Sequence, residues 1–151
     1  MAKGQVSTEL LVIVALVLLI FIPLLVMVYF KANDTNQQIA SYQAELAVFR
    51  VAYLANSVGS LGTSSSMYTD IYVPKSVRSF STAATGQGGE IKMQVDTPSG
   101  PSDIVEVVRY PITGAGTILS APNTGVWIRL NVSSEYTSGG VARVKVTKVA
   151  N

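Results

Sequence analysis

The longest hydrophobic segment of the chain lies near its start, at residues 10–30 (LLVIVALVLLIFIPLLVMVYF), and contains no charge, amide or glycine. A helix of this length spans roughly 30 Å, the hydrocarbon thickness of a bilayer. The segment is longer than the apolar core of a secretory signal, about 7–15 residues, and Lys31 follows it. It therefore predicts a membrane-competent helix that is not removed after the apolar segment.

Beyond Lys31, hydrophobic positions recur at steps of three and four, which draws one stripe along a helix. The stripe consists of Ile39, Tyr42, Leu46, Phe49 and Tyr53. Because no glycine occurs between Gln5 and Val58, one helix is predicted over about residues 7–58. We expect the stripe to pack against the rest of the same chain. The alternative is a contact with another subunit.

Pro23 is the only proline of the predicted helix. It removes the hydrogen bond to the carbonyl of Leu19 and crowds that carbonyl, which favours a kink or a local unwinding. One interpretation is a tolerated membrane-helix proline. The other is a flexible point used when the helix changes surroundings.

The pattern changes to alternation after residues 59–66 (GSLGTSSS), which predict the helix end with Gly59 or Gly62 at the cap. Apolar and polar residues alternate over residues 90–96 and 126–132, as in half-buried strands. Weaker segments of this kind are residues 67–73, 77–81, 103–110 and 141–149. The predicted fold is α+β: a long N-terminal hydrophobic helix followed by a small antiparallel β-sandwich-like head.

Composition narrows the chemistry that the chain can perform. Its 151 residues are enough for one ordinary domain, and they include no cysteine and no histidine. Disulfides, thiolate nucleophiles, Cys or His metal sites and histidine catalysis are therefore excluded, and we expect no enzyme and no cofactor. The 13% of charged residues is low for a soluble domain, and the net charge of +2 is scattered. Nucleic-acid binding has no support.

The residues just before the apolar segment, Lys3-Gly4-Gln5-Val6-Ser7-Thr8-Glu9, carry a specific motif. They resemble the class III signal peptide of archaeal type IV pilin-like proteins, in which a short basic leader precedes Q-x-S-x-E. The resemblance covers about the first thirty residues and matches at Gln5, Ser7 and Glu9. It implies cleavage by a prepilin peptidase between Gly4 and Gln5, on the cytoplasmic side of the membrane.

The resemblance and the hydrophobic pattern together divide the chain into a leader at residues 1–4, a long helix at 5–60 and a β-rich head at 61–151. The helix has an apolar half at 10–30 and an amphipathic half at 31–58. The resemblance also implies partners: other copies in a helical filament, the prepilin peptidase, a pilus assembly ATPase and a membrane platform protein. The precursor would lie in the cell membrane with its N-terminus in the cytoplasm, and the processed chain in an extracellular surface filament.

Glu9 has two interpretations. In the family, the glutamate at the fifth processed position pairs with the amino terminus of a neighbouring subunit. Here the new terminus would be Gln5, which can cyclise and lose its positive charge. The role of Glu9 as the fifth residue of the processed chain is therefore better supported than an ion pair with the amino terminus. The local alternative is that Ser7 caps the helix and Glu9, in its first turn, meets the positive end of the helix dipole.

Other candidate sites lie further along the chain. Asn33 and Asn131 begin N-glycosylation sequons, and Asn131 is the better candidate because alternation places it outward. A glycan on Asn33 would clash in a tight filament core. Trp127 and Tyr136 are candidate surface aromatics, although a sheet buried on both faces is favoured. Asp96, Asp103 and Glu106 lack calcium-loop spacing and are interpreted as surface acids rather than a metal site.

The favoured function is a structural pilin that polymerises through its hydrophobic helix and serves adhesion or surface attachment. The first alternative is a single-pass membrane-anchored extracellular β-domain that binds a partner and never polymerises. The second is a minor pilin that primes or tips filaments. It shares every sequence feature with the favoured function and differs only in abundance along the filament.

Overall fold

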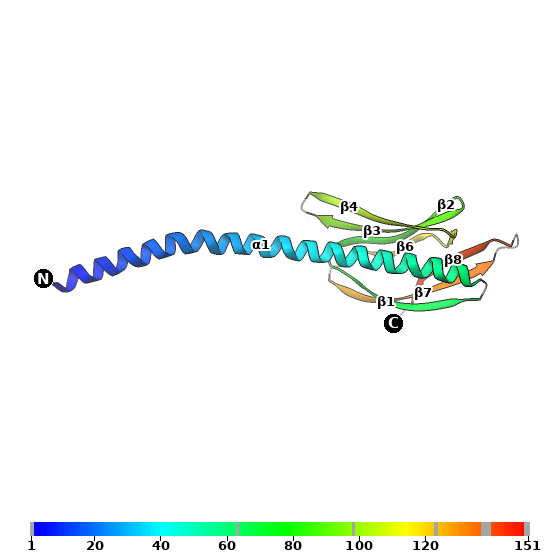
Figure 1. The fold of residues 1–151 in the computed structure, drawn as a ribbon, viewed down its shortest axis with the longest axis horizontal. Helices are drawn as coiled ribbons and strands as arrows, with labels where there is room; N and C mark the ends of the chain where they lie inside the picture. The colour runs from blue at the N-terminus through cyan, green and yellow to red at the C-terminus, as the bar shows by residue number, and fades with distance from the viewer. Residues whose placement is uncertain (1, 63, 98, 123, 137–139, 150–151) are drawn as a thin grey trace. The chain divides into compact units, whose positions relative to one another are not determined.

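The computed structural model describes the backbone of residues 2–62, 64–97, 99–122, 124–136 and 140–149, with side chains from residue 7 onward. Helix α1 (Ala2–Leu61) precedes all the strands (Figure 1). The strands are β1 (Ser66–Val73), β2 (Val77–Thr85), β3 (Gly88–Thr97), β4 (Gly100–Val108), β5 (Ile112–Thr113), β6 (Gly116–Ser120), β7 (Val126–Tyr136) and β8 (Ala142–Lys148). The predicted α+β order of one long apolar helix followed by mainly antiparallel strands is confirmed.

Helix α1 extends beyond the predicted residues at both ends. It continues without interruption through Pro23, so of the two alternatives at Pro23 the local unwinding is absent, and the ribbon of residues 2–38 is curved (Figure 1). At the C-terminal end, Gly62 has φ +90°, a left-handed conformation that glycine adopts without strain. Gly62 therefore fills the predicted cap position, whereas Gly59 lies inside the last turns of the helix.

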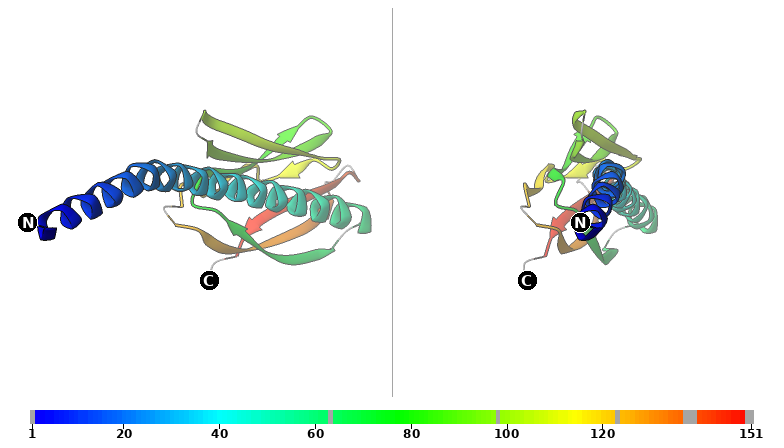
Figure 2. Two further views of the ribbon diagram at one scale, coloured as in Figure 1. Left: turned by 60° about the vertical axis from the view of Figure 1, so that its left-hand side comes forward. Right: turned by 90° about the vertical axis from the view of Figure 1, so that its left-hand side faces the viewer.

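The strands form two four-stranded sheets, with strand orders β1-β7-β8-β5 and β4-β3-β2-β6. Figures 1 and 2 show the sheets facing each other, with the second half of α1 running alongside them. All six predicted strands are present. The short strands β5 and β6 were not predicted, and β5 pairs with β8 in parallel, Ile112 opposite Val144.

The chain forms two compact units, residues 1–38 and residues 39–151, so the second half of α1 belongs with the strands. One hydrophobic core joins this half-helix to both sheets. The helix contributes small side chains to it: Ala44, Ala47, Val48, Val51, Ala52, Ala55 and Val58. The Asn56 side-chain oxygen also accepts a hydrogen bond of 2.9 Å from the Arg109 backbone N–H, which fixes the helix to the chain just after β4.

The stripe of large hydrophobic residues is not part of this core, which corrects the sequence-based expectation. Its members, from Ile39 to Tyr53, are 48–68% exposed. Positions two residues apart on a helix point about 200° away from each other. Because Ala44, Ala47 and Val51 are buried in the core, Leu46, Phe49 and Tyr53 point away from the core.

Candidate functional site

Two apolar surfaces stand out, and the first is the N-terminal half of α1. Every side chain of residues 10–30 is exposed, and the large hydrophobic ones have 47–75% of their surface accessible. The part of the helix from Ser7 to Leu61 is long and apolar enough to cross a membrane, by length and composition. A helix that is hydrophobic on all sides is stable only when lipid or other protein covers it.

The motif residues lie at the start of this helix. The helical backbone includes Lys3, Gly4 and Gln5, but their side chains lie outside the described residues, so the predicted cleavage site has no side-chain geometry here. Ser7 and Glu9 are exposed. Because α1 begins at Ala2, Ser7 does not cap it and Glu9 is not in its first turn. The capping interpretation is therefore wrong for the chain with residues 1–4 attached.

The second apolar surface is a groove of about 500 Å³ on the unit of residues 39–151. One wall is formed by α1 and includes the last three residues of its exposed stripe, and the other wall is formed by β1 and β7. We call it the aromatic groove, and its lining is Gln43, Leu46, Ala47, Phe49, Arg50, Tyr53, Asp70, Ile71, Tyr72 and Trp127. Seven of these ten residues have hydrophobic or aromatic side chains, so the groove suits an apolar partner.

Two cross-strand pairs build the sheet wall of the aromatic groove. Tyr72 and Trp127 lie opposite each other in the β1–β7 register, with ring centroids 5.5 Å apart and planes at 53°. Asp70 and Arg129 are also opposite, and Nε and Nη2 of Arg129 donate to the carboxylate at 2.8 and 3.1 Å. This hydrogen-bonded pairing lowers the pKa of Asp70 and raises that of Arg129.

Trp127 and Tyr136 are exposed, at 65% and 49%, so the favoured prediction of a sheet buried on both faces is wrong. Alternation along β7 does hold, since Ile128, Leu130 and Val132 point into the core. Trp127 points to the opposite, outer face of this sheet, where the described part of the chain leaves it largely exposed. The same alternation places Tyr72 on the outer face, a signal that sequence reasoning did not use.

The two sequons differ in accessibility. Asn33 is exposed on α1, and the hydroxyl of Thr35 in its sequon donates to the Lys31 carbonyl at 2.9 Å. Asn131 lies on the outward side of β7 as predicted, but it is half-buried and its side-chain oxygen is covered. Glycosylation at either site stays a prediction, and Asn33 is the more open of the two.

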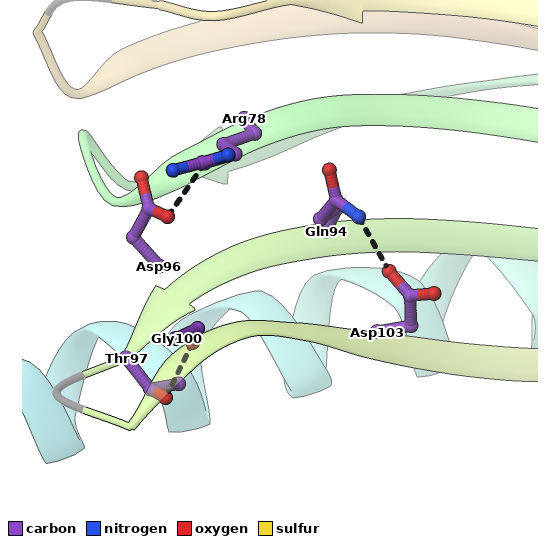
Figure 3. A network of polar contacts seen from close by, with 6 residues as sticks. All are labelled: Arg78, Gln94, Asp96, Thr97, Gly100 and Asp103. Atoms are coloured by element: carbon purple, nitrogen blue, oxygen red, sulfur yellow. Dashed lines mark hydrogen bonds and ion pairs between the residues drawn. The ribbon is translucent and has the colours of Figure 1, made fainter.

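The acids considered for metal binding lie on the sheet of β2, β3 and β4. Asp96 pairs with Arg78 at 2.6 Å, and Asp103 accepts a hydrogen bond from Gln94 at 3.0 Å (Figure 3). Asp103 also pairs with Lys92 at 2.6 Å, and this contact lowers its pKa. These partners account for Asp96 and Asp103 as surface acids. Glu106, the third acid, lies on β4 opposite Ile91 of β3.

Comparison of the chain with protein-family models, with curated proteins and with solved structures found no match.

Proposed function

We propose that the chain is a structural pilin of an archaeal type IV pilus-like filament, processed between Gly4 and Gln5 and polymerised through its hydrophobic helix. One observation carries the proposal: a Q-x-S-x-E motif with a short basic leader stands directly before a helix segment that is apolar and exposed on every side. A membrane anchor alone requires the apolar segment but not the motif.

The physical basis is the similarity between lipid and a bundle of aliphatic helices. Moving residues 10–30 from hydrocarbon into such a bundle costs little hydrophobic energy, so side-chain packing decides whether the subunit stays in the membrane or joins the filament. An ionised carboxylate is costly in either place unless it is paired. Removing residues 1–4 would make Glu9 the fifth residue, close to a new amino terminus, where a neighbouring subunit can pair with it.

The proposed life cycle follows from this. The precursor lies in the membrane with its leader in the cytoplasm, where a prepilin peptidase removes it. An assembly ATPase and a platform protein then insert the subunit into the filament, with the β-rich head outward. The exposed head is the part that would contact surfaces, which supports a role in adhesion.

The test is N-terminal mass spectrometry of filaments sheared from cells that produce the chain. We expect a chain that begins at Gln5 or its cyclised form. Glu9→Ala should abolish incorporation, whereas Asp34→Ala, which changes an exposed acid on the same helix, should not. Three results together would identify a single-pass anchored β-domain instead: chains that retain Met1, extraction of the chain by detergent as a monomer, and cells that still make filaments when the chain is deleted.

A further inference from the structure

The exposed stripe of α1 has the spacing of a helix-pairing seam. Its large residues follow one another at steps of three, four, three and four, the spacing of the two core positions of a coiled-coil heptad. Such a seam fits the side chains of a second helix. Because the small-residue face of the same helix already packs on the head, the seam is available for a partner from outside the subunit.

The aromatic groove offers enough surface for a stable contact. Its exposed members include Phe49, Tyr53 and Trp127, which are 56–65% accessible, and the stripe continues beyond the groove with Tyr42 and Ile39. With about 150–250 Å² for each aromatic side chain, stripe and groove together expose on the order of 700 Å². A standard protein interface buries about 800 Å² on each partner.

We propose that the aromatic groove holds the apolar helix segment, residues 10–30, of a second copy of this chain. The inference rests on the proposed function and names the partner that the head contacts within the filament. Residues 10–30 form the apolar helical segment that the described part of the chain leaves uncovered. Because the hydroxyl of Tyr29, next to the end of this segment, is its only polar side-chain group, residues 10–28 can enter a hydrophobic groove without leaving a side-chain hydrogen-bonding group unsatisfied.

The polar residues of the groove are compatible with this occupant. The charge of Asp70 is paired with Arg129 in a two-point contact, so an apolar helix would not face an unpaired carboxylate. Gln43 and Arg50 have long side chains, which can cover apolar surface with their stems while their ends stay in water.

Photo-crosslinking of the full chain in cells tests the occupant. A photoreactive phenylalanine analogue replaces Phe49, and the control replaces Val107, which is 67% exposed on β4 and outside the groove. We expect crosslinked dimers from the Phe49 position, with the second attachment inside residues 10–30 of another copy. The Val107 position should not reach that segment.

Filaments that assemble while the Phe49 probe attaches to a head strand, to lipid, to another protein or to nothing would overturn the groove proposal alone. Wild-type chains that never polymerise would overturn the proposed function as well. A second measurement uses Leu46→Glu, which should lower filament yield about tenfold or more without changing the melting of the head. Val107→Glu should leave the yield unchanged, and normal assembly of Leu46→Glu would contradict the proposal.

Discussion

The two halves of α1 are continuous in backbone but have different surfaces. Residues 10–30 are hydrophobic on all sides and exposed throughout, so no face of the helix is distinguished. Residues 39–61 have a face of alanine and valine that is buried against the sheets and an opposite face of larger residues that is exposed. Lipid or protein must therefore cover the first half on every side, whereas the second half has only one apolar face left for a partner to cover.

The difference shows that side-chain size, rather than hydrophobicity, selects the buried face of the second half. Ala44, Ala47 and Ala55 are completely or almost completely buried, while Leu46 and Phe49 are not. Small residues let a helix backbone approach a packed surface closely. The larger residues then remain available for a second contact, and the same helix can serve the subunit's own core and an assembly.

The largest expected effect separates the two faces of residues 39–61. Val51→Asp places an unpaired charge in the core, where Val51 is fully buried, and should cost more than about 4 kcal/mol and unfold the head. Phe49→Asp, with the same helix propensity penalty, should cost less than about 1 kcal/mol. Circular dichroism melting of the full chain in detergent measures both. Equal losses of head stability from the two substitutions would contradict the distinction between the buried and exposed faces.

In residues 10–30 we expect no such face dependence. Leu18→Arg and Ile20→Arg, which lie about 200° apart around the helix, should impair membrane insertion similarly, by about 2.5–3.5 kcal/mol. The melting of the head should be unaffected. Fractionation of cells into membrane and soluble protein measures the insertion. A strong effect at one position and none at the other would show that this half is also two-faced.

Gly59 tests how closely the second half approaches the head. A Cβ at this position would overlap the ring of Tyr110. Gly59→Ala should therefore destabilise the head by about 1–3 kcal/mol, although alanine is the better helix former. Ser60→Ala, at the exposed neighbouring position, is the control and should have little effect. Stabilisation by Gly59→Ala would mean that the helix lies further from Tyr110.

The smallest effect is the acid dependence of the head. Arg129 and Lys92 hold the pKa values of Asp70 and Asp103 below the ordinary 3.8. A lowered folded-state pKa means that the stabilisation is complete above the unfolded-state pKa and is lost as pH falls through the folded-state value. The head should therefore melt at lower temperature below about pH 4. Asp70→Asn should weaken this dependence, and an unchanged pH profile would show that the pair contributes nothing.

Alternation and helical spacing predict most of the fold because they depend on local geometry. The strands around Ile91 and Ile128 follow the period-two pattern closely, and the head's main strands were found from it. Strands β5 and β6 have only two and five residues, too short for a pattern to appear. The parallel pairing of β5 with β8 joins distant segments, and no local signal records it.

The candidate site likewise has one part that the sequence predicts and one part that it does not. The motif at Gln5, Ser7 and Glu9 and the apolar segment after it are visible in the sequence. The aromatic groove is not, because it requires β1, β7 and one particular face of α1 to meet.

The sequence by itself determined that the chain has a long apolar helix, a β-rich head and a motif at their start, since each follows from neighbouring residues. Only the tertiary structure decided which face of the helix is buried. Both faces are apolar, so periodicity alone cannot rank them. The choice depends on which side chains are small enough to fit against two sheets formed by distant parts of the chain.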